Sequence, residues 1–229
     1  MDETNRNVFN PIVEMTADGS RTLYRADIDE HYGSVKGAAA ESRHVYVDCC
    51  LRRAAEGRRG CGGLRVLEIG FGTGLNAAMS VGAVEEPVEY VSLELYPLPA
   101  QEALALGYEE FAPAWRSVVE ASWDEAVEIT PGFTLDKRRA DFLATRLPAD
   151  VDAVYYDAFA PEKQPELWSA ECFERVFEAM RPGGVLTTYC AKGAVRRGLE
   201  AVGFTVERLA GPEGGKREIL RATKPISCN

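Results

Sequence analysis

Three glycines at alternate positions, Gly70, Gly72 and Gly74, are the residues of this 229-residue sequence best placed to bind a charged ligand. They follow an apolar run, residues 64–69, that is typical of a buried strand, and a helical pattern begins after them. Glycine lets the backbone turn sharply and approach a ligand closely, because no Cβ stands in the way. The amides that open the next helix then point at whatever lies over the strand end. The stretch predicts a cofactor-binding turn at the edge of a parallel α/β sheet.

The amino-acid sequence of this turn indicates which cofactor it suits. A dinucleotide fingerprint, G-x-G-x-x-G, needs a third glycine where this sequence has Leu75, so that fingerprint is absent. The sequence is instead E-x-G-x-G-x-G from Glu68 to Gly74, followed by Asn76, and it resembles the first motif of class I S-adenosylmethionine (SAM) methyltransferases. The carboxylate of Glu68 suits a sulfonium and an amino group better than a pyrophosphate. On this motif alone, a nicotinamide enzyme and a structural glycine turn stay open as alternatives.

Three acids follow at the ends of later predicted strands, where a cofactor and a substrate would be held. Glu94 lies 20 residues beyond Gly74, at the position from which an acid accepts hydrogen bonds from two ribose hydroxyls. Asp141 fits the neighbourhood of an adenine amino group, although a helix N-cap is an equal expectation. Asp157 ends a strongly apolar strand, and its alternative role is that of an N-cap or turn acid.

The acids are positioned by strands that alternate with helices and end in an antiparallel pair. This layout predicts an α/β, Rossmann-like class I methyltransferase fold with a seven-stranded, mostly parallel sheet and helices on both faces. We expect residues 1–62 to form an N-terminal cap, too short to hold its own core, and residues 63–229 to form the methyltransferase domain. The expected strands are 22–25, 64–69, 88–95, 133–140, 151–157, 185–189, 204–208 and 218–222, and the expected helices are 38–56, 75–84, 109–127, 166–180 and 192–202.

Composition restricts the function classes further. No apolar run approaches the roughly 20 residues of a membrane helix, and the polar N-terminus predicts no secretory signal and a cytoplasmic location. Six cysteines without C-x-x-C spacing and only two histidines predict reduced thiols and no metal site. The net charge of −10 argues against a simple nucleic-acid binder. From Arg181 onward, however, nine Lys/Arg face four Asp/Glu, which suggests a polyanion partner as readily as a solvated surface.

Several motifs together resemble one family. Two motifs come first, Y-R-A-D-I-D-E-H-Y-G-S and E-S-R-H-V-Y-V. They are followed, in this order, by G-F-G-T-G-L-N, D-A-F-A-P-E-K-Q-P-E-L-W, R-P-G-G-V-L-T-T-Y, G-A-V-R-R-G-L-E-A-V-G-F and G-G-K-R-E-I-L. Residues 22–222 are thereby similar to the methyltransferase lobe of the MnmC family and its stand-alone MnmD relatives, with a poor fit between Gly107 and Phe133. The resemblance implies SAM-dependent N-methylation of the 5-aminomethyl group of wobble (2-thio)uridine in tRNA.

Bifunctional members of that family also carry a C-terminal FAD-dependent oxidase. This sequence has no second glycine-rich fingerprint, so we expect the methyltransferase activity alone, with SAM and without FAD or a metal. A separate enzyme would then supply the aminomethyl substrate. A methyltransferase of a small amine or other metabolite is the alternative, and a non-catalytic SAM- or nucleotide-binding module is a third.

Several residues are expected to act around the substrate. The resemblance places Asp157 at the reacting centre, where we expect positioning and charge stabilisation to outweigh proton abstraction, because a carboxylate favours the ammonium form of an amine. Phe159 and Pro161 would wall the pocket and stack a flipped base, while Tyr32 and Glu41 would close over it. The expected phosphate contacts are Lys192, Arg196, Arg197, Lys216 and Arg217.

Overall fold

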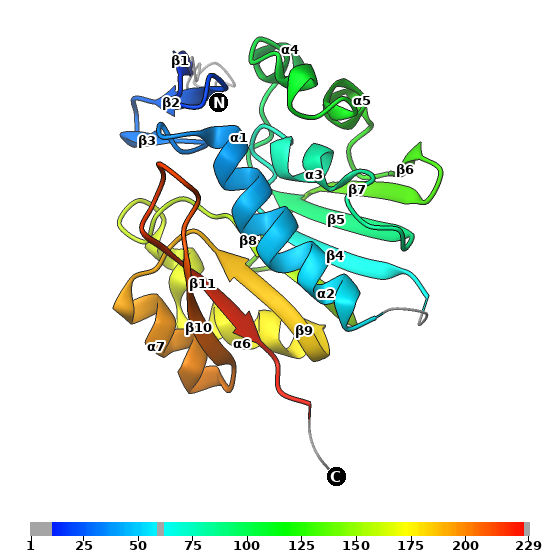
Figure 1. Cartoon of the computed structure of the whole chain (residues 1–229), viewed down its shortest axis with the longest axis vertical. Coiled ribbons are helices and arrows are strands. Elements are labelled where there is room, and N and C mark those ends of the chain that lie inside the picture. The colour runs from blue at the N-terminus through cyan, green and yellow to red at the C-terminus, as the bar shows by residue number, and fades with distance from the viewer. Residues whose placement is uncertain (1–10, 59–61, 227–229) are drawn as a thin grey trace, which may run out of the picture.

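An eight-stranded sheet forms the centre of the computed structural model, which describes residues 11–58 and 62–226 (Figure 1). The strand order is β10-β11-β9-β8-β4-β5-β7-β6. Strands β9, β8, β4, β5 and β7 are parallel, whereas β6 and β11 run antiparallel to their neighbours. The strands are β4 (Leu64–Ile69), β5 (Val88–Glu94), β6 (Ala126–Thr130), β7 (Phe133–Arg139), β8 (Val151–Tyr156), β9 (Met180–Thr188), β10 (Thr205–Ala210) and β11 (Glu218–Thr223).

The position of β4 determines where a ligand can bind. This strand comes first in the sheet by sequence, yet it lies between β8 and β5. The chain therefore builds β5, β6 and β7 on one side of β4 and then returns to build β8 and β9 on the other. At such a switch point the loops after the two central strands diverge, and a crevice opens at the carboxyl edge. The Rossmann-like methyltransferase fold expected from the sequence is confirmed.

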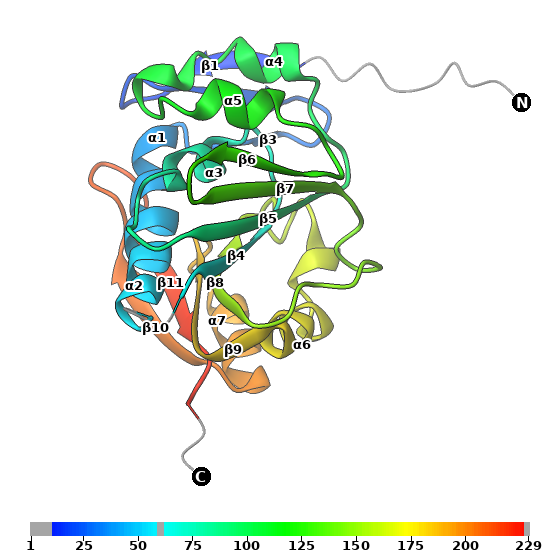
Figure 2. The same ribbon diagram turned by 90° about the vertical axis from the view of Figure 1, so that its right-hand side faces the viewer.

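Helices cover both faces of the sheet (Figure 2). Within β4, Val66 packs into a cluster with α3, α5 and the N-terminal helix, whereas Leu67 packs into a second cluster with α6 and α7. This alternation is the two-residue period of a strand buried on both faces. The remaining elements are β1 (Ile12–Met15), β2 (Arg21–Arg25), β3 (Glu30–His31), α1 (Ala38–Glu41), the π-helical η1 (Ser42–Leu51), α2 (Arg52–Glu56), α3 (Leu75–Ser80), α4 (Ala100–Leu104), the 3₁₀ turns η2 (Tyr108–Glu110) and η3 (Pro165–Trp168), α5 (Trp115–Glu120), α6 (Ala170–Ala179) and α7 (Gly193–Val202).

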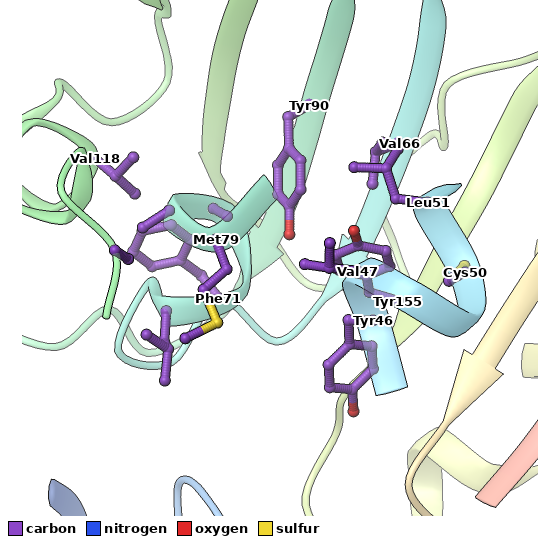
Figure 3. Packing of buried hydrophobic residues seen from close by; sticks show 14 of the residues in the cluster. Tyr46, Val47, Cys50, Leu51, Val66, Phe71, Met79, Tyr90, Val118 and Tyr155 are labelled. Carbon is purple, nitrogen blue, oxygen red and sulfur yellow. The ribbon is translucent and has the colours of Figure 1, made fainter. Parts of the chain in front are cut away.

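The N-terminal part has two components. Strands β1, β2 and β3 form a separate antiparallel sheet, and α1, η1 and α2 follow one another as a continuous helix across the main sheet (Figure 1). Val47, Cys50 and Leu51 of η1 belong to the same buried cluster as Val66 and Tyr155 of the central strands (Figure 3). This helix therefore forms part of the layer that covers the main sheet.

The chain between residues 107 and 133 corrects one expectation. A helix was expected over 109–127, but α5 covers only Trp115–Glu120. Pro113 precedes it and cannot continue the hydrogen bonding of η2 into α5. Residues 126–130 then pair with β7 as an edge strand. The sheet consequently has eight strands rather than the seven expected.

The ends of other elements shift by smaller amounts. Strand β9 begins at Met180 rather than at residue 185, and the helix after the glycine turn ends at Ser80 rather than at residue 84. Within residues 11–58 and 62–226, no helix combines the length and the apolar character needed to cross a membrane. Among the described residues, the free cysteines are Cys49, Cys50, Cys172 and Cys190.

Candidate active site

A cleft of about 1620 Å³ opens at the carboxyl edge of the sheet, where β4, β5 and β8 end. A typical small-molecule site has roughly 300–1,000 Å³, so this cleft has room for a cofactor and a second group. The glycine loop, the ends of β5 and β8, and the segment before η1 form its walls. Of the expected site residues, those that line the cleft are Tyr32, Glu41, Gly70, Gly72, Asn76, Glu94, Asp141, Asp157 and Phe159.

The glycine loop adopts backbone conformations that other residues rarely take. Gly70, Gly72 and Gly74 have φ angles of 92°, 51° and 75°. A Cβ on Gly70 would lie 2.8 Å from the carbonyl oxygen of Asp157, and a Cβ on Gly72 would lie 3.1 Å from Cδ1 of Tyr32. Gly74 precedes α3 and is not part of the cleft lining. Gly70 and Gly72 therefore present bare backbone to the cleft floor. We call this the cradle; a side chain at either position would distort it, because its Cβ would collide with Asp157 or crowd Tyr32.

The glycine loop is also held by contacts on the side that faces away from the cleft. Trp115 Nε1 donates a hydrogen bond to the carbonyl oxygen of Thr73 at 2.9 Å. The buried Lys137 ammonium lies 5.0 Å from the ring centroid of Phe71 and donates to the carbonyl oxygen of Val119 at the end of α5. Burial lowers the pKa of Lys137 to about 8. These contacts fix the loop against the helical layer, so the cradle is formed in advance of any ligand.

Two of the strand-end acids face the cleft from the β5 and β7 side. Glu94 accepts hydrogen bonds from the amides of Gly72 at 3.2 Å and Tyr96 at 2.9 Å, and these two bonds orient its carboxylate at the loop. Asp141 accepts from the amide of Leu143 at 2.8 Å. Asp141 therefore caps a turn and not the helix that was the alternative expectation, and it also lines the cleft.

Asp157 lies directly after β8, beside the glycine cradle. The hydroxyl of Tyr46 donates to its Oδ1 at 2.5 Å, and Asn76 Nδ2 donates to its Oδ2 at 2.8 Å. Burial raises the pKa of Asp157 to about 7, and the hydrogen bonds from Tyr46 and Asn76 oppose that rise because they stabilise the charged form. The carboxylate therefore titrates close to neutral pH, with both oxygens held in place.

Glu68 lies beneath the glycine loop rather than in the cleft, contrary to the expected direct contact with a cofactor. Side chains alternate along β4, so Glu68 points to the same face as Val66, under α3. The residue is fully buried, and its Oε2 accepts from Ser92 Oγ at 2.6 Å. Burial raises the pKa of Glu68 to about 8, partly offset by that hydrogen bond.

Replacing Glu68 with glutamine is expected to flatten the pH dependence of stability. The folded protein retains a proton on Glu68 that the unfolded chain releases, since the pKa rises from 4.5 to about 8 on folding. Its contribution to stability is complete below pH 4.5 and is lost as the pH rises toward 8. Urea unfolding at acidic, neutral and alkaline pH measures this. Glu85→Gln, an exposed acid after α3, is the matched control and keeps the wild-type dependence. The same slope in E68Q as in the wild type would contradict the assignment.

Three of the four expected substrate residues outside the basic set line the cleft, and the fourth does not. Tyr32 and Phe159 meet edge to face, with ring centroids 5.2 Å apart, and together they form an aromatic wall of the cleft. Glu41 is buried and accepts from the amide of Ser34 at 3.2 Å. Pro161, in contrast, follows Phe159 in the loop and is not among the residues that line the cleft.

The basic candidates lie outside the cleft lining, and several are engaged with acids. Lys216 Nζ lies 3.6 Å from Glu41 Oε1 and 3.6 Å from the ring centroid of Tyr189, so it points inward rather than away from the protein. Lys192 pairs with Glu162, and Arg196 pairs with Glu200. Arg197 and Arg217 are exposed.

Three further residues contribute to the site but were not identified from the sequence: Tyr46, Ser42 and Tyr189. Tyr46 contacts Asp157 directly, Ser42 Oγ donates to Asn76 Oδ1, and Tyr189 lines the cleft. The four-residue spacing of Ser42 and Tyr46 was the available signal, since it places two hydroxyls on one helix face. Among the described residues, no group of three or more His, Cys, Asp or Glu is arranged to hold a metal ion.

Known proteins with similar sequences also include methyltransferases. Residues 123–225 match a family model described as S-adenosyl-L-methionine-dependent methyltransferase. The chain is 34% identical over 219 residues to the tRNA 5-methylaminomethyl-2-thiouridine biosynthesis bifunctional protein MnmC of Pseudomonas savastanoi pv. phaseolicola, covering 86% of this chain and 32% of the relative. It is 37% identical over 232 residues to the protein of the same name from Ectopseudomonas mendocina, covering 85% and 34%. The chain thus spans about one third of the length of these curated relatives.

Solved structures resemble the whole chain. The crystal structure of MNMC2 from Aquifex aeolicus has a TM-score of 0.72 and 26% identity, covering 98% of this chain and 75% of that one. Spermidine synthase from Thermotoga maritima, 14% identical with a TM-score of 0.57, covers 94% and 73% and shares the fold alone. Taken with the glycine loop and the strand-end acids, these matches show that the chain is similar to S-adenosyl-L-methionine-dependent methyltransferases and to the part of the MnmC proteins that it covers.

Proposed function

We propose that this protein transfers a methyl group from SAM to the primary amine of 5-aminomethyl(-2-thio)uridine at the wobble position of tRNA. The observation that carries the proposal is the Asp157 carboxylate, held by two donors beside the glycine cradle. A carboxylate attracts positive charge on nitrogen, which grows as an amine is methylated. The names of the relatives, which concern tRNA 5-methylaminomethyl-2-thiouridine biosynthesis, support this choice of amine.

The residues of the cradle fit SAM by their chemistry. Gly70 and Gly72 line the cleft with backbone alone, and the oriented Glu94 carboxylate suits a pair of ribose hydroxyls. Asp141 can accept from an adenine amino group, and Asn76 lines the floor between the loop and Asp157. Gly74 and Glu68 would not touch the cofactor but would support the shape of the glycine loop. When bound, SAM supplies a methyl group already activated by its sulfonium, so the protein mainly positions the amine.

Asp157 would orient that amine. A primary alkylamine has a pKa of roughly 10.4 in water, so it must lose a proton before its lone pair can attack. A carboxylate close by works against this loss. We therefore propose that Asp157 does not remove the proton. It accepts a hydrogen bond from an N–H of the neutral amine, directs the lone pair toward the methyl group, and stabilises the positive charge that forms on nitrogen. Because the pKa of Asp157 is about 7, this role requires neutral or alkaline pH.

The remaining walls suit a nucleoside that has left its stack. Tyr32 and Phe159 provide an aromatic surface for a flipped base, and the N-terminal segment that carries Tyr32 would act as a cover. Arg197 and Arg217 are exposed and available to phosphates. Lys192 and Arg196 would first have to leave their acidic partners. A separate enzyme would supply the aminomethyl group.

The net charge of −10 favours a second candidate, methylation of a small amine. Salt dependence distinguishes the two, because binding of a polyanion releases its counterions, and the free energy gained from that release falls as the salt concentration rises. Initial rates with tRNA carrying 5-aminomethyluridine and with putrescine should be compared between about 50 and 200 mM salt. A steep loss with tRNA and no turnover of putrescine supports the proposal. Turnover of putrescine that is faster and insensitive to salt overturns it.

Replacing Glu94 with glutamine is expected to weaken SAM binding about tenfold, equivalent to roughly 1.4 kcal/mol. Glutamine retains one acceptor oxygen but loses the charge and the second acceptor that a ribose diol requires. Isothermal titration calorimetry with SAM measures the change. Glu89→Gln is the matched control, because Glu89 lies on the same strand but is exposed and pairs with Arg65. Equal affinities in the two variants would remove Glu94 from the cofactor site.

A further inference from the structure

Tyr46 is a buried residue of η1 whose hydroxyl reaches the reacting end of the cleft. Its side chain is 2% exposed, and its ring packs against Tyr155 with centroids 5.1 Å apart. The hydroxyl donates to Asp157 Oδ1 at 2.5 Å, across 111 residues of sequence. A donor so close to a partly buried carboxylate is a charge-assisted hydrogen bond, the stronger class in proteins.

A second arm holds the other oxygen of Asp157. Asn76 Nδ2 donates to Oδ2 at 2.8 Å, and Ser42 Oγ donates to Asn76 Oδ1. Because Ser42 occupies the amide oxygen, the amide nitrogen is the group left to face Asp157. Ser42 and Tyr46 both come from the π-helical segment η1, a helix type that often occurs at functional sites.

We propose that Tyr46 is a positioning residue for methyl transfer, which fixes the rotation of the Asp157 carboxylate and holds it in its ionised form, with Ser42 supporting the second oxygen through Asn76. This inference rests on the proposed function of the cleft. With one lone pair of each oxygen engaged by these donors, the others stay free to accept an N–H from the cleft side. Loss of Tyr46 would let the carboxylate rotate and take up a proton.

Other ionisable groups also face Asp157, and their effects oppose one another. Glu41 raises the pKa of Asp157, whereas Lys216 lowers it. Asp157 in turn raises the pKa values of its neighbours. The groups that face it from the surrounding elements are Glu41 and Tyr46 of the N-terminal helix, Glu68 of β4, Tyr90 of β5, Tyr189 after β9 and Lys216 between β10 and β11.

The test compares Tyr46→Phe with Tyr155→Phe. Both substitutions remove one buried hydroxyl from the same pair of packed rings, but the Tyr155 hydroxyl bonds to Ser80 rather than to Asp157. In Y46F, the acidic limb of the kcat profile should move up by about one pH unit, as expected for loss of a hydrogen bond to the charged form. The limb should stay at its wild-type pH in Y155F. A fall in kcat with a nearly constant KM for tRNA is also expected in Y46F.

A direct titration keeps the test independent of turnover. Carbon-13 NMR of aspartate-labelled protein, with the Asp157 signal assigned from Asp157→Asn, should give a higher Asp157 pKa in Y46F than in the wild type. Ser42→Ala should shift it in the same direction by less, which covers a Y46F variant that fails to fold. An unchanged pKa in both variants overturns the inference. A wild type that binds SAM but methylates no tRNA overturns the proposed function instead, and the titration still decides the role of Tyr46.

Discussion

Replacing Asp157 with asparagine is expected to lower kcat for methyl transfer about 10³-fold, within the range of preorganised electrostatic and acid–base contributions. Asparagine has a similar size and can still accept from Tyr46, but it carries no negative charge and directs an N–H toward one of the donors that hold Asp157. The substituted site therefore no longer stabilises a positive nitrogen. Single-turnover methyl transfer to tRNA carrying 5-aminomethyluridine measures the effect, and calorimetry should give a nearly unchanged Kd for SAM.

Asp150→Asn is the matched control for this experiment. Asp150 is an exposed acid just before the same strand, and its φ of 56° is one that asparagine tolerates. Asp150→Asn should transfer methyl groups at the wild-type rate. A D157N protein with wild-type kcat would remove Asp157 from the reacting centre, whereas loss of SAM binding in D157N would assign it to the cofactor site instead.

Replacing Gly70 with alanine is expected to weaken SAM binding about 100-fold, equivalent to roughly 2.7 kcal/mol. Alanine is strained at a φ of 92°, and its Cβ would lie 2.8 Å from the Asp157 carbonyl oxygen, which is backbone and cannot rotate away. The loop or the start of the D-A-F-A-P segment must therefore move, and the cradle is lost. Calorimetric titration with SAM and the unfolding free energy together measure the change.

Gly82→Ala separates strain from loss of the cradle. Gly82 also has a positive φ, 69°, but a Cβ there would meet no atom within 4 Å. This variant should lose about 1 kcal/mol of stability from backbone strain and bind SAM as the wild type does. If G70A kept wild-type affinity while showing the same loss of stability as G82A, the glycine loop would not form the cofactor cradle.

The fold could be predicted because its signals are local. The apolar runs that became β4, β5 and β8 are buried along most of their length, and each has a length and composition that a parallel strand requires. An acid directly after such a strand must lie at the carboxyl edge, which is why Glu94, Asp141 and Asp157 meet at one cleft. Strand β6 was missed because the spacing of the apolar residues before it also suits a helix, and only its pairing with β7 shows that residues 126–130 form a strand.

The less predictable part of the site depends on contacts between distant segments. Tyr46 lies 111 residues from Asp157, and only the packing of η1 on the sheet directs its hydroxyl there. Lys216 belongs to a basic stretch that suggests an open surface, yet Glu41 and the ring of Tyr189 draw it toward the cleft rim. Glu68 has the position of a cofactor acid in the motif, but strand alternation turns it beneath the loop.

Methyl transfer to a defined nucleoside is the most direct test of the proposed activity. The protein should be incubated with SAM labelled at its methyl group and with tRNA that carries 5-aminomethyl-2-thiouridine at the wobble position, followed by nucleoside mass spectrometry. Matched tRNA with an unmodified wobble uridine is the control. We predict labelled 5-methylaminomethyl-2-thiouridine in the first tRNA and no label in the second. Protein that binds SAM and leaves the aminomethyl nucleoside unlabelled would contradict the account.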